Sequence, residues 1–285
     1  MLDGVISGLI SGSAYAILAV CVVMLYRLVG VVNFGLAAIG ALGAYICYAI
    51  VGTGLSLGAA VIAGLTVAGA VAGFCGWVLA RWFGQPSETV RAVVAVVILI
   101  VVLTLGFRLF GDSPRVMPSL LPQASFVLGG VRLSLATVIA VALAAVVAVG
   151  LTLLLKHTRL GTRLEAMAER PVTVQLLGVN TRALSMGAWA ATGMIATLAM
   201  LLIAPTRNPT FETMSFLIVP ALAAALLGAF SNVWVAAVGG LAIGAIEGAG
   251  ARFDWLSSYR GALPFVIVVI ALIWLRRREV WDARR

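Results

Sequence analysis

A polar interval, residues 156–182 (KHTRLGTRLEAMAERPVTVQLLGVNTR), separates two long apolar runs of this 285-residue chain. Within it, residues 159–169 place Leu160, Leu164 and Met167 at helical spacing and surround them with charged side chains. Apolar residues on one side and charges on the other predict a short amphipathic helix at a membrane surface. The chemistry that such an element offers is contact with another surface.

A second short helix is expected to begin at Pro171, a favoured first-turn residue, and to stop at Gly178. Asn180 or Thr181 would then cap the next apolar helix. The interval has 27 residues, whereas about two to eight are usual between packed helices. One interpretation is a linker that lies on lipid headgroups, and the other is a docking platform for a protein outside the lipid. The length and the two-helix pattern favour the platform.

Residues that catalyse reactions or bind metals are sparse. Lys156 is the only lysine and no GxxxxGK[ST] phosphate loop occurs, so the chain cannot bind and hydrolyse ATP by that chemistry. His157, the one histidine, lies in the basic interval and is expected to be solvated. Cys21, Cys47 and Cys75 stand far apart in apolar sequence without metal-type spacing. We therefore expect no enzyme activity, no bound metal and no cofactor.

Two polar positions within the apolar runs are candidates for a substrate pathway. Asn33, followed by Phe34 and Gly35, lies where the second run can be broken, and discontinuous helices often form the substrate sites of transporters. A helix start near the cytoplasmic face, capped by Asn33, explains these residues equally well. Glu247 is an acid inside a late apolar run, and an intramembrane carboxylate is a functional candidate. An interfacial ion pair with Arg252 is the simpler explanation of Glu247.

The elements that carry these residues are membrane spans. Hydrophobic residues make up 63% of the chain and charged residues 10%, with a mean hydropathy of +1.16, which excludes a soluble globular protein. Continuous apolar runs indicate helices rather than barrel strands, and each span needs about 20 residues. The runs are 5–26, 28–80, 92–107, 133–155, 183–206, 213–251 and 261–275.

Splitting residues 28–80 near 52–54, and residues 213–251 near Ser231 and Asn232, gives nine spans. Eight follow if one is re-entrant or shallow, because Pro220 would kink the seventh span and the last run is short. We therefore expect an all-α integral membrane protein. Its single domain, residues 1–285, would be a polytopic bundle of eight or nine transmembrane helices with short cytoplasmic coupling helices.

Basic residues predict the orientation of the bundle. If residues 156–182 are cytoplasmic and nine spans alternate, 13 lysine and arginine residues lie inside and six outside. The positive-inside rule then places the N-terminus outside and the C-terminus in the cytoplasm. It also gives an external loop at 108–132 and a basic cytoplasmic tail at 276–285. No basic surface interleaved with aromatic residues supports nucleic-acid binding.

Short motifs occur in a consistent order along nearly the whole chain: GLISGSAYA at 8–16, VVNF at 31–34, LGAY at 42–45, the segment 111–135, RLG at 159–161, AMAERP at 166–171, LLGVNT at 176–181, and GG and GAIE at 239–240 and 244–247. Together they resemble the branched-chain amino acid permease family of ABC importers. Residues 35–38, 95–105 and 228–232 depart from the family's usual residues, so the resemblance does not fix a particular substrate.

The resemblance implies ATP-driven import by alternating access in a bacterial plasma (inner) membrane. It implies cytoplasmic ABC ATPase subunits that bind the ATP, a second permease subunit in a homo- or heterodimer, and an extracytoplasmic substrate-binding protein. Branched-chain or other hydrophobic amino acids are the expected cargo. Urea or short amides, or instead an ion-coupled secondary transporter or channel, are the alternatives. The residues expected to couple to the ATPase are Arg159, Leu160, Arg163, Leu164, Glu165, Met167, Glu169, Arg170, Leu177 and Gly178.

Overall fold

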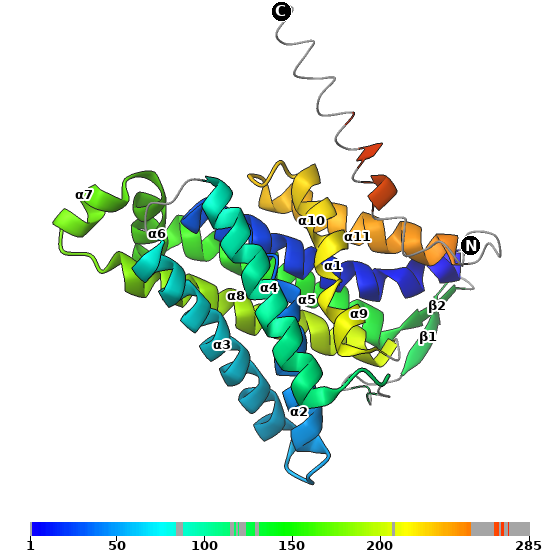
Figure 1. Ribbon diagram of the computed structural model, residues 1–285. Coiled ribbons are helices and arrows are strands. Elements are labelled where there is room, and N and C mark those ends of the chain that lie inside the picture. Colours follow the sequence, from blue (N-terminus) through cyan, green and yellow to red (C-terminus); the bar gives the residue numbers. More distant parts are fainter. Residues whose placement is uncertain are drawn as a thin grey trace, which may run out of the picture.

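Helices dominate the computed structural model, which describes residues 2–83, 88–114, 117, 119, 124–128, 131–206, 209–251, 265–267, 269, 270 and 273 (Figure 1). The elements are α1 (Leu2–Val29), α2 (Leu36–Val51), α3 (Leu57–Trp82), α4 (Glu88–Phe110), β1 (Ser125–Leu128), β2 (Val131–Ser134), α5 (Leu135–His157), α6 (Arg159–Glu169), α7 (Pro171–Leu176), α8 (Thr181–Ile203), the 3-10 turn η1 (Ala204–Thr206), α9 (Phe211–Ser215), α10 (Ile218–Leu227) and α11 (Val233–Gly250).

Six of these helices, α1, α3, α4, α5, α8 and α11, are long and apolar enough to cross a membrane, and two shorter apolar stretches cover Leu36–Val51 and Phe211–Leu227. The expectation of an all-α polytopic bundle is confirmed. Both predicted interruptions are also confirmed, because residues 52–54 form the turn between α2 and α3 and Asn232 caps α11. The expected last span, residues 261–275, and the tail at 276–285 lie largely or wholly outside the described residues.

The core of the bundle is built around α1, which contacts α5, α8, α10 and α11. Residues 11–25 are all buried, as expected for a helix that is apolar on every side. Its tightest contact is with α11, where a Cβ on Gly244 would overlap the backbone of Gly12. Only glycine lets two helix backbones approach this closely, and such small-residue seams hold helices together in lipid.

The segment between α8 and α11 does not form one span. α9 ends at Ser215 and α10 begins at Ile218, so the apolar stretch is broken at Phe216 and Leu217. The sequence predicted that Pro220 kinks this span, and the structure has a complete break one turn before that residue. In a continuous helix the ring of Pro220 would clash with the carbonyl of Phe216, and no N–H would be present to bond it. Two short helices therefore replace a kinked span, with Pro220 in the first turn of α10.

A β-hairpin covers the end of the predicted external loop, residues 108–132, and the first two residues of the predicted span at 133–155. β1 and β2 pair antiparallel from Ser125 opposite Ser134 to Leu128 opposite Val131. The backbone N–H of Leu135 donates to the carbonyl oxygen of Ala124 at 2.9 Å. The hairpin therefore leads directly into the start of α5.

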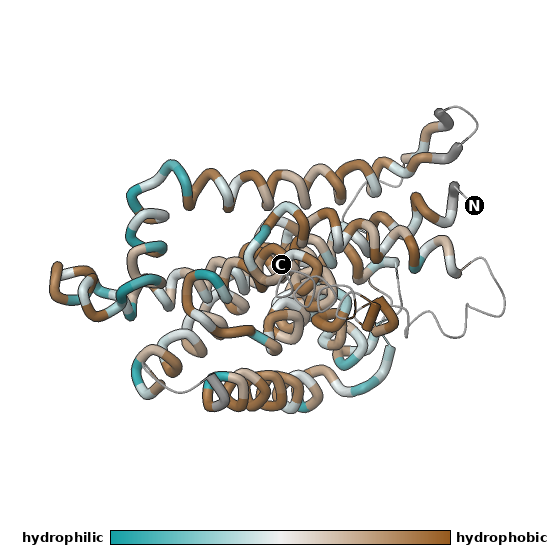
Figure 2. Tube along the Cα trace, turned by 90° about the horizontal axis from the view of Figure 1, so that it is seen from above, coloured by the Kyte–Doolittle hydropathy of each residue, from teal (hydrophilic) through white to brown (hydrophobic). Residues whose placement is uncertain are grey.

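The two ends of the bundle differ in polarity. α6 and α7 project at one end, and the N-terminus and the β1–β2 hairpin lie at the other (Figure 1). Figure 2 shows hydrophilic residues gathered around α6 and α7, with hydrophobic residues along the long helices. The polar interval thus stands outside the apolar bundle, at the end where α1 finishes.

Candidate coupling surface and substrate pathway

A tight corner joins α5 to α6. The hydroxyl of Thr158 caps α6 by accepting a hydrogen bond from the backbone N–H of Gly161 at 3.0 Å. Gly161 lies against the end of α5, where a Cβ would overlap the carbonyl oxygens of Leu154 and Leu155. Any side chain here would force the corner open, because packed backbone has no room to give. The corner therefore fixes the direction in which α6 leaves the bundle.

One face of α6 packs against the bundle. Leu164 and Met167 are only 9% and 7% exposed, and α6 contacts both α1 and α5. Glu165 reaches Arg27 at the end of α1, with Oε1 4.0 Å from Nη2. An exposed pair of this kind contributes little stability, but it links α6 to α1. Leu164 and Met167, two of the expected coupling residues, thus anchor α6 to the chain's own core.

The side of α6 and α7 that faces away from the bundle is exposed and partly apolar. Pro171 opens α7 and Gly178, with φ of 79°, follows its end, as the sequence predicted. The side chain of Asn180 caps α8, also as predicted. Leu176 and Leu177 are 83% and 77% exposed, more than any other large hydrophobic side chain in the described part of the chain. The remaining expected coupling residues, Arg159, Leu160, Arg163, Glu165, Glu169 and Arg170, are exposed as well.

We call the exposed apolar side chains of α6 and α7 the coupling surface. It comprises Leu160, Val172, Leu176 and Leu177, which stand among charged residues. Apolar side chains held out into water from a protruding element mark a contact site. Such a row fits a hydrophobic groove of a partner protein, the mode in which an amphipathic helix is bound.

Residues 30–35 interrupt the helical path between α1 and α2. The N-cap of α2 is Gly35 and no side chain caps that helix, so Asn33 is not the cap that one interpretation expected. Asn33 is instead fully buried, and neither Oδ1 nor Nδ2 has a hydrogen-bond partner among the described residues. An unpaired buried amide costs about 1 to 3 kcal/mol. Only the cap is therefore wrong: Asn33 lies in the connection between α1 and α2, and its part in a substrate pathway stays a prediction.

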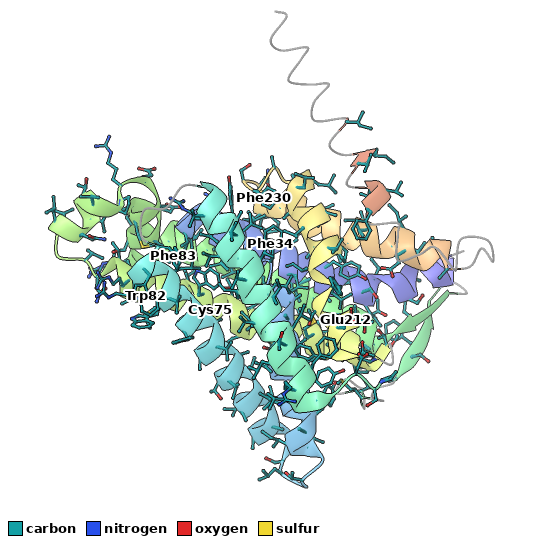
Figure 3. The ribbon with its side chains drawn as sticks, viewed as in Figure 1. Phe34, Cys75, Trp82, Phe83, Glu212 and Phe230 are labelled. Atoms are coloured by element: carbon teal, nitrogen blue, oxygen red, sulfur yellow. The ribbon has the colours of Figure 1, made fainter. Side chains whose placement is uncertain are left out.

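The other residues of the interruption lie beside α4. A Cβ on Gly35 would come within 3.0 Å of Cγ2 of Ile98, so α4 packs closely against this turn. Phe34, labelled in Figure 3, is partly buried and packs against the hydrophobic core. Gly35 of this connection therefore lies against α4, and Asn33 and Phe34 directly precede it in the chain.

Glu247 lies elsewhere, in the seam between α1 and α11. It is 6% exposed, and the hydroxyl of Tyr15 donates a hydrogen bond to its Oε2 at 2.7 Å. Tyr15 belongs to the middle of α1, whereas Asn33 follows the end of that helix. Glu247 is thus not joined to the other three candidates. Arg252, its expected partner, lies outside the described residues.

An aromatic cluster ties α2, α4 and α9 together. Tyr45 packs against Phe110 and Phe211, with ring centroids 5.0 and 5.5 Å away. Its hydroxyl donates to the carbonyl oxygen of Pro209 at 2.9 Å. Sequence reasoning missed this cluster, because its rings come from distant segments and each looks like an ordinary apolar residue in its own run.

Six helices that are long and apolar enough to cross a membrane, together with a polar element that protrudes at one end of the bundle, define a multi-pass membrane protein. The family model described as "Branched-chain amino acid transport system / permease component" matches residues 4–272. The chain belongs to this family, as the order of its motifs indicated.

Curated relatives have similar length. The high-affinity branched-chain amino acid transport system permease protein BraD of Pseudomonas aeruginosa is 25% identical over 290 residues, which cover 95% of this chain and 93% of BraD. LivH of Escherichia coli, a permease protein with the same description, is 25% identical over 294 residues, which cover 95% of this chain and 92% of LivH. Among solved structures, that of PsaBC from Streptococcus pneumoniae in complex with Fab is similar to this chain, with a TM-score of 0.47 and 13% sequence identity. The match covers 93% of this chain and 89% of that chain.

Proposed function

We propose that this chain is the transmembrane permease subunit of an ATP-binding-cassette importer, and that a separate cytoplasmic ATPase drives it. The coupling surface is the observation that carries the proposal. Leu176 and Leu177 are highly exposed on an element that the chain's own packing holds in place. Exposed apolar side chains on an element that the buried Leu164 and Met167 anchor to the bundle suit the transmission of force from a partner better than a linker that lies loosely on lipid.

The contacts suggest how a push on α6 would reach the spans. Leu164 and Met167 fasten α6 to the bundle, and Glu165 links it to Arg27 at the end of α1. The chain then continues directly into the interruption that holds Asn33. Closure of two ATPase subunits on nucleotide would therefore bias the region around Asn33 between an outward-facing and an inward-facing state.

Branched-chain or other hydrophobic amino acids are the proposed cargo. BraD and LivH are described as branched-chain amino acid permeases, and a pathway with few charges suits a small zwitterion with an apolar side chain. The pathway would pass Asn33, Phe34 and Gly35, where the Asn33 amide offers both donors and an acceptor. Urea and short amides could use the same amide, and competition with labelled leucine uptake would separate these cargoes. Glu247 stays a second pathway candidate.

An ion-coupled transporter or a channel is the alternative class. Coupling to protons or sodium needs ionisable groups deep in the spans. Among the described residues of the spans, Glu247 is the one charged side chain that is buried, and it already accepts a hydrogen bond from Tyr15. Because the described spans offer so few ionisable groups for ion coupling, they favour the ATP-driven mechanism.

The proposed assembly contains a second permease chain, two ATPase subunits and an extracytoplasmic binding protein in a bacterial inner membrane. Alternating access at a permease interface needs two transmembrane halves. The end with α6 and α7 would face the cytoplasm, and the N-terminus would lie outside.

Replacing both Leu176 and Leu177 by Asp tests the ATPase contact. Each exposed anchor is worth about 2 kcal/mol if it fills a partner pocket, so copurification of the ATPase should be lost and uptake should stop. Leu55→Asp is the control, because Leu55 is 59% exposed in the turn between α2 and α3, away from the coupling surface. Uptake that persists after deletion of every ATPase gene of the transport operon would overturn the importer assignment.

A further inference from the structure

A cavity of about 510 Å³ lies beside α6 and α7, among the ends of α1, α3, α4 and α8 and the turn after α10. Its apolar wall includes Phe83 and Phe230, which Figure 3 labels at the ends of α3 and α10. Its polar wall contains Arg27, Arg91 and Arg182. No carboxylate belongs to the described residues that line it. Three arginines thus belong to the lining of one partly apolar space.

The positive charge of this wall is only partly compensated. Arg27 lies in the last turn of α1, where a cation is favourable, and it pairs with Glu165. Arg91 makes a long hydrogen bond, 3.5 Å from Nη1 to the carbonyl oxygen of Gly30, and within the described chain it has no ion pair. Arg182 likewise has none there, and it stands in the first turn of α8, where the helix dipole disfavours a cation.

A buried hydroxyl in the same wall also lacks an acceptor. Ser185 follows Arg182 by one turn of α8 and lines the cavity. It is 5% exposed, and its Oγ has no hydrogen-bond partner among the residues that the structure describes. Buried hydroxyls are normally hydrogen-bonded. An anion in the cavity would accept from Ser185 and would also benefit from the positive end of α8.

The surroundings place this cavity at the level of lipid headgroups. Trp82, next to Phe83 of the wall, is 62% exposed, and Tyr26 of the wall is 43% exposed. Exposed Trp and Tyr at helix ends mark the membrane interface, and basic pockets between transmembrane helices bind phospholipid head groups. We propose that this cavity binds the phosphate of an acidic phospholipid headgroup through Arg91, Arg182 and Ser185.

A zwitterionic amino acid fits this cavity poorly, because its ammonium group would lie among guanidinium groups with no carboxylate to receive it. Asn33 itself does not line this cavity, although Gly30 and Val31 of the same connection do, so the proposed lipid site adjoins the proposed cargo pathway. Bound lipid would brace the ends of α3, α4 and α8 against the element that carries the coupling surface, so transport should depend on acidic lipid.

The test uses the purified full chain in phosphatidylcholine nanodiscs. Phosphatidylglycerol is added in one arm and inorganic phosphate in the other, and retained lipid is counted by native mass spectrometry alongside the Tm. Wild-type protein should retain phosphatidylglycerol and gain Tm. The double variant Arg91→Gln, Arg182→Gln should bind it about 25-fold more weakly, since each interfacial arginine is worth about a factor of five. The matched control is Arg81→Gln, an exposed arginine at the end of α3 that does not line the cavity.

Stabilisation by inorganic phosphate alone, lost in the double variant, would support the oxyanion site but give it a soluble source. Equal lipid retention by the wild type and the double variant would overturn the proposal. The proposal would also be overturned if neither anion had an effect and the double variant lost ATPase binding, because the arginines would then contact an acidic partner protein. If the double variant does not fold, Arg182→Gln alone is used, because Arg182 is an exposed residue, and its lipid binding should weaken by about fivefold.

Discussion

Asn33 is a buried polar side chain whose amide has no hydrogen-bond partner among the described residues. A buried amide without protein partners can have its hydrogen bonds completed by water or by a bound molecule, and we propose that the cargo does so at Asn33. We predict that Asn33→Leu, which keeps the volume but removes the polar atoms, raises the stability of the permease by about 1 kcal/mol. Uptake of labelled leucine should fall by about tenfold or more, the equivalent of one lost hydrogen bond to cargo. Thermal unfolding in detergent and uptake in cells measure the two effects.

The matched control for this substitution is Thr192→Val. Thr192 is also buried, but its hydroxyl donates to carbonyl oxygens of its own helix, 3.0 Å from Ala188 and 2.9 Å from Trp189. Its removal should leave uptake near the wild-type level. Full uptake by Asn33→Leu would remove Asn33 from the pathway.

Single residues show where sequence reasoning reached its limit. Asn33 could be selected because it is a polar residue near two glycines in an apolar run. That pattern does not distinguish an amide that caps a helix from a buried amide without a partner. That distinction depends on where α2 begins. Glu247 was selected as an intramembrane acid, yet its partner Tyr15 lies 232 positions away. No local pattern could have named that partner.

Among the elements, α6 and α7 were predictable because their boundaries are encoded locally. Pro171 and Gly178 are start and stop signals that act within one turn. The break at Phe216 and Leu217 has a local signal as well, because Pro220 cannot bond the carbonyl of Phe216 four residues earlier. The sequence does not show where the two short helices go: α9 contacts α2 and α4, while α10 contacts α1 and α11.

The seam between α1 and α11 should tolerate no side chain. A Cβ on Gly244 would overlap backbone atoms of Gly12, so we predict that Gly244→Leu destabilises the bundle by about 3 kcal/mol or more through overpacking. The amount of folded protein in the membrane and its Tm measure this effect. Gly150→Leu is the control, because a Cβ on Gly150 of α5 meets nothing within 4 Å. Equal yields of the two variants would show that the seam can open.

The whole molecule has two chemically distinct ends, and the structure fixes which segments share an end. The ion pair between Arg27 and Glu165 puts the end of α1 on the side of α6. The cavity there also brings the end of α3 and the start of α4 to the same side. The turn between α2 and α3 must then lie on the other side. Which of the two sides faces the cytoplasm follows only from the distribution of lysine and arginine.

Cysteine labelling in intact cells tests this orientation. With Cys21, Cys47 and Cys75 replaced by Ala, Thr53→Cys places a thiol in the exposed turn between α2 and α3, and Thr173→Cys places one on exposed α7. A membrane-impermeant maleimide should label the Thr53 variant in intact spheroplasts, and the Thr173 variant only after permeabilisation. The six outer against 13 inner basic residues make this the favoured direction of insertion. The opposite labelling pattern would turn the coupling surface away from any cytoplasmic ATPase, and the importer mechanism would then lose its source of force.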